Sequence, residues 1–204
     1  MGKEQLISKV KNFWYYHKWH LLVALFVVAT IIVGVRSCQQ RPNPDLHILF
    51  AKQDNQIPLQ ATELEGFFGP MVEDVNGDGV STALVTATTI KTVDGSNTAA
   101  MLVQVNSGEA ILYVLTDETY KILHENGVLE DLSALSAESE FLDGDRYLLS
   151  ASGALDDLEY FKNDKTSYYL AMRKVQGTTL QDSSKHQEQA RMAKTVLNYL
   201  IENE

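Results

Sequence analysis

An apolar run of fifteen residues, which begins at Leu21 and ends at Val35 without a single charge, constrains this chain more than any other feature. At a helical rise of about 1.5 Å per residue the run covers ~23 Å, somewhat less than the ~30 Å hydrocarbon core of a bilayer. A helix in a globular core would have a polar stripe for solvent, and this run has none. The sequence therefore predicts a transmembrane helix whose flanks complete its length.

Basic residues flank the run on both sides, and aromatic residues flank it on the N-terminal side. Trp14 and Trp19 belong to an aromatic belt on the N-terminal side, and Arg36 can reach the headgroups at the other end. Four lysines precede the run and two arginines follow it. Because basic residues favour the cytoplasmic side, we expect residues 1–19 in the cytoplasm, a single transmembrane helix over residues 20–36, and the rest of the chain outside the cell membrane.

Two other interpretations compete with a transmembrane helix that is retained in the mature protein. A cleaved signal peptide normally has a short basic start, whereas twenty residues rich in aromatic side chains precede this run. Lipoprotein processing at Cys38, the only cysteine, is the second alternative, although Arg36 fits poorly before the small Ser37. Either outcome leaves the body of the protein outside. A single cysteine also excludes an intramolecular disulfide.

Charge divides the chain at the same place. Residues 1–41 hold six basic residues and one acidic residue, and the whole chain has a net charge of −10, so residues 42–204 carry −15. So acidic a body repels nucleic acids, which excludes nucleic-acid binding. Residues 37–45 contain two prolines and form an extended linker. Residues 46–204 suffice for one extracytoplasmic domain with a buried core.

The body alternates between strand-like and helix-like segments, which is typical of an α/β domain built from right-handed βαβ units. We therefore predict a single mixed, mainly parallel sheet with helices on both faces. The expected strands are residues 46–51, 80–90, 110–115, 146–151 and 167–173. The expected helices are residues 57–72, about 96–107, 117–126 and 184–203, the first ended or kinked at Gly69-Pro70.

Two parts of the sequence resemble known families. Residues 106–110 (NSGEA), the apolar strand that follows, the Thr116-Asp117 cap and residues 127–132 (GVLEDL) are similar to one lobe of the extracellular solute-binding proteins of bacterial transporters. The head (NFWYYHKWH) and its apolar helix resemble single-pass membrane proteins of Gram-positive anaerobes. The resemblance implies a single lobe of a periplasmic-binding-protein-like fold. Because a solute-binding protein closes two lobes around its ligand, the resemblance does not imply transport.

One short motif has metal chemistry of its own. Residues 74–79 (DVNGDG) match the opening half of a calcium loop, in which Asp74, Asn76 and Asp78 present alternate oxygens to one ion and Val80 offers its carbonyl group. The closing acid is missing, because Val85 occupies its position. The alternative is a tight Asx-type turn that leads into the next strand. Calcium is the one cofactor that the sequence suggests.

Enzyme signatures are missing from the sequence. The five histidines are scattered without a second metal ligand at suitable spacing, and no nucleophile elbow or phosphate-binding loop occurs. We therefore expect no catalysis. Residues 116–118 and 150–153, at strand ends, are candidates for contact with a partner, and the alternative is that they form ordinary turns.

Two functions of different classes stay open. The first is a membrane-anchored extracytoplasmic binding domain, non-catalytic, that meets an envelope protein or a second copy of itself. The alternative is a single-pass solute sensor, or a lipoprotein-type solute-binding component of a transporter, with a small-molecule ligand. The short cytoplasmic head has no room for a signalling domain, which favours the first.

Overall fold

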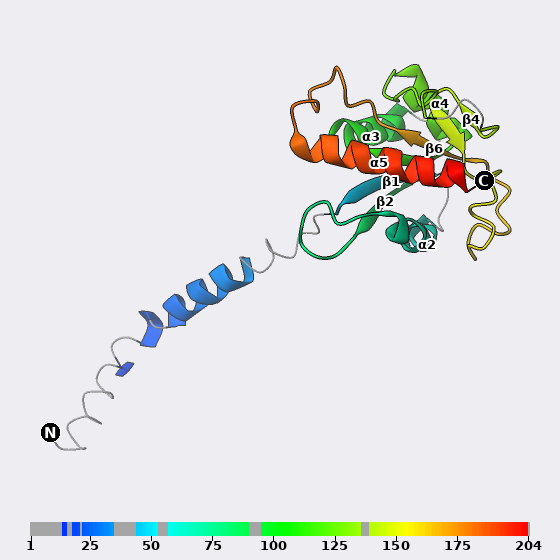
Figure 1. Ribbon diagram of the computed structural model, residues 1–204. Helices are drawn as coiled ribbons and strands as arrows, with labels where there is room; N and C mark the ends of the chain where they lie inside the picture. Colours follow the sequence, from blue (N-terminus) through cyan, green and yellow to red (C-terminus); the bar gives the residue numbers. More distant parts are fainter. Residues whose placement is uncertain are drawn as a thin grey trace. The chain divides into compact units, whose positions relative to one another are not determined.

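The computed structural model describes residues 14–15, 18–20, 22–34, 44–52, 57–89, 95–135 and 139–203. The chain forms two units, Met1–Asn43 and Pro44–Glu204. In the first unit residues 22–34 are helical (Figure 1). Among the described residues, no helix has both the length and the apolar character that crossing a membrane requires.

The second unit alternates strands and helices in nearly the predicted order. α2 ends at Gly69-Pro70, as the sequence predicts, and the two-residue β4 is a strand that the sequence did not indicate. The strands are β1 (Leu46–Lys52), β2 (Ala83–Thr89), β3 (Leu112–Thr116), β4 (Leu142–Asp143), β5 (Arg146–Leu148) and β6 (Tyr168–Met172). The helices are α2 (Ile57–Phe68), η1 (Gly69–Met71, a 3-10 turn), α3 (Gly95–Asn106), α4 (Asp117–Glu125) and α5 (Ser184–Glu202).

All six strands form one sheet with the order β2-β1-β3-β6-β5-β4. β1 pairs in parallel with β2 and with β3, whereas the other three pairings are antiparallel. The predicted mixed sheet is confirmed, but the prediction that it is mainly parallel is wrong. The βαβ alternation that produces parallel neighbours stops after α4, and the chain then returns to β6 through a hairpin and a long turn segment.

Helices cover both faces of the sheet, as predicted. β1 is buried at every residue, which explains why five of its seven residues are apolar and why they do not alternate strictly with polar ones. In Figure 1, α5 crosses one face of the sheet. On that face the core includes Leu46, Ile48 and Phe50 of β1, Leu64 of α2 and Val196 of α5. On the other face it includes Leu49 and Ala51 of β1, Met101 of α3 and Leu123 of α4.

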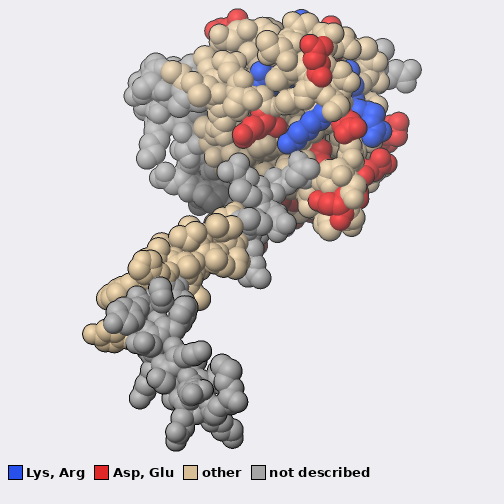
Figure 2. Space-filling view, turned by 90° about the vertical axis from the view of Figure 1, so that its left-hand side faces the viewer, with Lys and Arg blue, Asp and Glu red and all other residues tan. Residues whose placement is uncertain are grey.

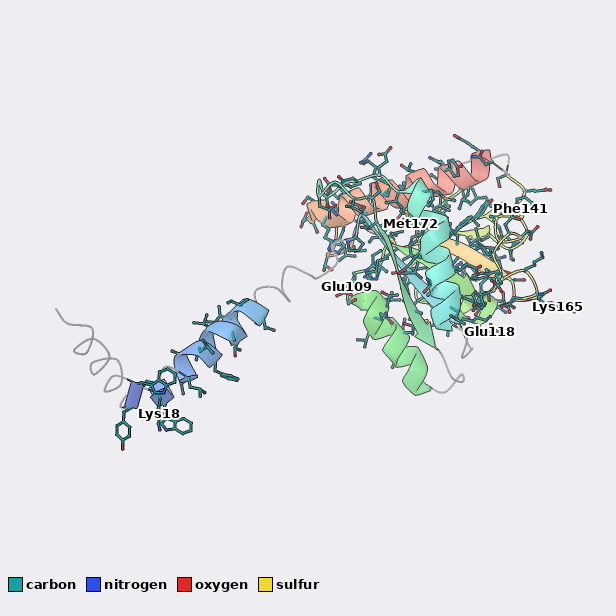
Figure 3. The ribbon with its side chains drawn as sticks, turned by 90° about the horizontal axis from the view of Figure 1, so that it is seen from below. Lys18, Glu109, Glu118, Phe141, Lys165 and Met172 are labelled. Atoms are coloured by element: carbon teal, nitrogen blue, oxygen red, sulfur yellow. The ribbon has the colours of Figure 1, made fainter. Side chains whose placement is uncertain are left out.

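The order β2-β1-β3 creates a switch point between β1 and β3. The connection from β1 leaves toward β2 and the connection from β3 leaves away from it, so the loops diverge at the carboxyl ends of the two strands. This is the place where open α/β sheets bind their ligands. In Figure 3, Glu118 and Lys165 lie at this end of the domain, and Glu109 lies at the opposite end.

Candidate functional site

Four polar side chains meet at the carboxyl end of β1, and we call them the Lys52 centre. Lys52, the last residue of β1, forms an ion pair with Oδ2 of Asp164. The same oxygen accepts hydrogen bonds from Oη of Tyr168 (2.6 Å) and Nε2 of Gln60 (3.2 Å). Gln60 also accepts a hydrogen bond from Nζ of Lys52 at 3.4 Å. Three donors, from β1, α2 and β6, therefore converge on one carboxylate oxygen.

The donors of the Lys52 centre are buried. Lys52 is 6% exposed, and Gln60 and Tyr168 are each 1% exposed. The Lys52 ammonium group also lies 5.4 Å from the centroid of the Tyr168 ring, which attracts a cation. A buried charge is tolerated only when it is paired and hydrogen-bonded, and the centre meets both conditions.

The pairing fixes the ionisation of the centre. Burial lowers the pKa of Lys52, but its hydrogen bonds to Asp164 and Tyr168 outweigh burial, and the pKa lies above the ordinary value. For Asp164, burial raises the pKa, but hydrogen bonds from Lys52, Thr166 and Tyr168 outweigh it, and the pKa lies well below the ordinary value. Burial, followed by the hydrogen bond to Asp164, raises the pKa of Tyr168 to about 12. At neutral pH the centre therefore holds an ammonium, a carboxylate and a neutral phenol.

Asp164 is carried by a short segment, residues 162–167, which we call the flap. It consists of turn and coil, and it lies between two buried aromatic residues, Phe161 and Tyr168. Their rings contact each other with centroids 5.1 Å apart. Lys162, Asn163, Lys165 and Ser167 of the flap are exposed, whereas Asp164 and Thr166 are half-buried. The flap is thus anchored at both ends and inserts one carboxylate between them.

A second candidate is a surface hollow of about 510 Å³ beside α4 and the β4–β5 turn. Asp145 accepts a hydrogen bond from Tyr120 and contacts Nδ1 of His124, each at 2.7 Å. Arg146 lies over the rings of Tyr120 and Tyr169, 4.8 and 5.0 Å from their centroids. These polar groups use one another as partners in an open, acidic hollow. The hollow therefore indicates a particular class of ligand less clearly than the buried Lys52 centre does.

The predicted calcium residues lie in the loop between η1 and β2, where their side-chain oxygens accept backbone N–H groups of the same loop. Asp74 accepts hydrogen bonds from Gly77 (2.7 Å) and Gly79 (2.8 Å). Asn76 accepts one from the backbone N–H of Asp78 at 2.9 Å. Asp78 accepts one from the backbone N–H of Val80 at 2.9 Å. These are the bonds of the Asx-type turn.

Asp45, which the sequence analysis did not single out, lies directly before β1 and binds this loop through its side chain. Its carboxylate accepts the backbone N–H groups of Val75, Asn76 and Thr82 at 2.8 to 2.9 Å. Within the described part of the chain, no group of three or more His, Cys, Asp or Glu side chains is placed to hold a metal. Calcium binding by the loop stays a prediction.

The predicted anchor residues are described only in part. Trp14 and Trp19 are 61% and 69% exposed. Leu21, Val35, Arg36 and Cys38 lie outside the described residues.

The two strand-end segments that the sequence pointed to lie beside the Lys52 centre. Thr116 is the register partner of Tyr168 in the sheet, and Oγ of Ser150 accepts the backbone N–H of Tyr168 at 3.2 Å. The sequence missed the centre itself. One signal was present: Lys52 follows the inward-facing Leu46, Ile48 and Phe50 at alternate positions, and a lysine there needs a buried counter-charge.

No protein-family model, curated protein or solved structure matches the chain. The resemblance to solute-binding proteins and to single-pass membrane proteins therefore stays a prediction, and function has to be argued from the site and the two units.

Proposed function

We propose that this protein is a membrane-anchored, non-catalytic binding domain that faces the outside of the cell membrane. One observation carries the proposal: an apolar helix whose described side chains are all exposed. Leu25 and Phe26 are each 69% exposed, and Ile31 is 59% exposed. So large an apolar surface is not left in water, and a lipid bilayer is the partner that would cover it on every side.

The residues around this helix support a bilayer as its partner. Trp14 and Trp19 are exposed next to the apolar segment, where an aromatic belt would meet the headgroups. Lys18 lies 5.8 Å from the centroid of the Tyr15 ring, so a cation and an aromatic group share the same interface. The excess of lysines before the run favours a cytoplasmic N-terminus.

The charge of the protein favours the apolar helix, and not the surface of the folded domain, as the part that attaches the protein to the membrane. Acidic side chains are spread over the face of the domain in Figure 2, with a smaller group of basic side chains among them. Residues 42–204 carry a net charge of −15, and anionic headgroups repel such a body.

The geometry of the second unit favours binding over catalysis. The Lys52 centre lies at the switch point, where α/β domains bind ligands. Its lysine is charged at neutral pH because Asp164 is its partner, and an ammonium group is not a nucleophile. The parallel strand order β2-β1-β3 supports the finer proposal that the fold is one lobe of the periplasmic-binding-protein type.

The topology is tested with single cysteines in intact cells. On a Cys38→Ser background, Asn203→Cys reports on the body and Lys3→Cys on the head. A maleimide that does not cross membranes should label the body cysteine in intact cells and the head cysteine only after lysis. Deletion of residues 21–35 should release the protein from the membrane fraction. The opposite labelling pattern, or unchanged membrane association after the deletion, would overturn the proposal.

The solute-sensor alternative is separated from the binding domain by partner and ligand. A thermal-shift screen of the full chain in detergent micelles against small solutes should give no specific response if a protein partner is the ligand. A saturable shift with one solute class would favour the sensor.

A further inference from the structure

The Lys52 centre has the composition of a receptor for a carboxylate. Nζ of Lys52, Nε2 of Gln60 and Oη of Tyr168 all donate to Oδ2 of Asp164. The three donors are held by β1, α2 and β6, each of which is fixed by the cores of the domain. The carboxylate, in contrast, comes from the flap, which belongs to no helix or strand. A rigid donor set and a loosely held acceptor are the arrangement expected where one acceptor can replace another.

Apart from the Asp164 carboxylate, the flap is held mainly by backbone hydrogen bonds to the turn before it, from Lys162 N–H to Leu158 and from Asp164 N–H to Phe161. Four of its six side chains, those of Lys162, Asn163, Lys165 and Ser167, are exposed. The backbone N–H of Thr166 donates to Oδ1 of Asp164 at 3.0 Å, which is a bond within the flap itself. Lifting the flap between Phe161 and Tyr168 would therefore cost the contacts of one carboxylate and the backbone hydrogen bond from Asp164 N–H to the Phe161 carbonyl group, which is 2.9 Å long.

We propose that Lys52, Gln60 and Tyr168 form a binding site for a ligand carboxylate, and that Asp164 fills this site until the flap lifts and an external carboxylate replaces it. The proposal gives the binding domain of the previous subsection a ligand class. It rests on that subsection only in treating the domain as a binder, because the site exists whether or not the chain is anchored in a membrane.

Competition with Asp164 sets the expected affinity. An intramolecular carboxylate acts at an effective concentration of order millimolar or higher, so a free monocarboxylate binds the wild-type chain weakly. Removal of the internal competitor should tighten binding by at least about tenfold.

The first experiment is chemical rescue of Asp164→Gly in the full chain in detergent micelles. The methyl group of acetate replaces the missing Cβ, and its carboxylate replaces the missing side-chain group. We expect 100 mM sodium acetate to raise the melting temperature of this variant by several degrees relative to 100 mM sodium chloride. Asp143→Gly is the matched control, because Asp143 is 77% exposed at its side chain and should show no acetate response.

The double variant Lys52→Met, Asp164→Gly tests whether the lysine is the receptor. It should lose the acetate response. An equal response in the double variant, or no acetate response in Asp164→Gly, would overturn the proposal. If Asp164→Gly does not fold, the isosteric Asp164→Asn replaces it in a titration, where acetate should bind at least about tenfold more tightly than to the wild-type chain.

The second experiment asks whether an external carboxylate lifts the flap of the wild-type chain. Lys162 and Lys165 are exposed trypsin sites on the flap, and Lys174 is an exposed site outside it. Saturating acetate should speed cleavage after Lys162 and Lys165 at least twofold over chloride and leave cleavage after Lys174 unchanged. Unchanged flap cleavage would show that Asp164 is never displaced, which overturns the proposal.

The source of the carboxylate is resolved in the same assay. Flap cleavage is measured with acetate, with citrate, and with a short peptide in two forms. One form has a free C-terminal carboxylate and the other has a C-terminal amide. A response to the free peptide and not to the amide identifies a peptide terminus as the ligand, whereas a stronger response to citrate identifies a small organic acid. These results do not depend on the membrane topology, so failure here is separable from failure of the anchor.

Discussion

Lys52 and Asp164, which are 112 residues apart in the sequence, form the ion pair that joins the end of β1 to the flap. Lysine and aspartate are 7% and 17% exposed at their side chains, so the pair is mostly withdrawn from water. Lys52→Met removes the cation and leaves a carboxylate in a poorly hydrated site. We expect a loss of unfolding free energy of about 3 kcal/mol, measured by urea unfolding of the full chain in detergent.

The exposed pair of Lys121 and Asp117 on α4 is the control for this variant. Lys121 is 63% exposed at its side chain, and Lys121→Met should change the free energy of unfolding by less than about 0.5 kcal/mol. A similar cost for the two lysine variants would show that the burial of Lys52 contributes nothing to stability.

The order of helices and strands in the domain follows from local sequence signals. Residues 46–51 are apolar except for His47 because β1 is buried on both faces, and Gly69-Pro70 stops α2 because proline lacks an N–H for the helix. The direction of β6 was not predictable in this way. A strand's own residues do not record whether its neighbour runs parallel, and only the length and nature of the connection between them does.

The candidate site was less predictable than the fold. Lys52 could be recognised as an inward-facing lysine, but its partner is one of 27 acidic residues, and nothing local to Asp164 distinguishes it. Asp45 is a similar case. Its role depends on three N–H groups 30 to 37 residues away, which the fold brings together and local sequence does not indicate.

The contact of Asp45 with the 74–79 loop predicts that removal of this one side chain lowers the free energy of unfolding substantially. Asp45→Ala leaves three backbone N–H groups without their acceptor, and we expect a loss of about 2 kcal/mol of unfolding free energy with faster amide exchange at Val75 and Asn76. Asp74→Ala, which removes bonds only within the exposed loop, should cost less. Equal losses for the two variants would show that the loop is not held from the sheet.

His47 predicts a pH dependence of stability. Its ring contacts the Thr86 hydroxyl at 2.6 Å, and burial lowers its pKa from the ordinary 6.5, with Glu109 opposing the shift and Lys185 adding to it. The unfolded chain therefore binds more protons than the folded chain just below pH 6.5. The stabilising contribution is complete above that pH and is lost as the pH falls below it.

The variant His47→Gln keeps a polar group beside Thr86 but does not titrate. Between pH 7.5 and about pH 5, the melting temperature of the wild-type chain should fall by more than that of His47→Gln. Identical pH profiles for wild type and His47→Gln would contradict this account of His47.

Glu65 occupies a backbone donor at the open edge of the sheet. β2 is an edge strand of seven residues (ALVTATT) without a charge of its own, and an uncharged edge is prone to pair with another chain. The Glu65 carboxylate of α2 accepts the backbone N–H of Val85 at 3.0 Å and thereby occupies a donor on this strand.

Glu65→Ala should free that donor and shift the full chain toward larger species in sedimentation velocity at equal concentration. Glu65→Gln retains an acceptor oxygen and should sediment like the wild type. If Glu65→Ala sediments like the wild type, or if Glu65→Gln associates as strongly as Glu65→Ala, the carboxylate does not act as an acceptor that protects the edge.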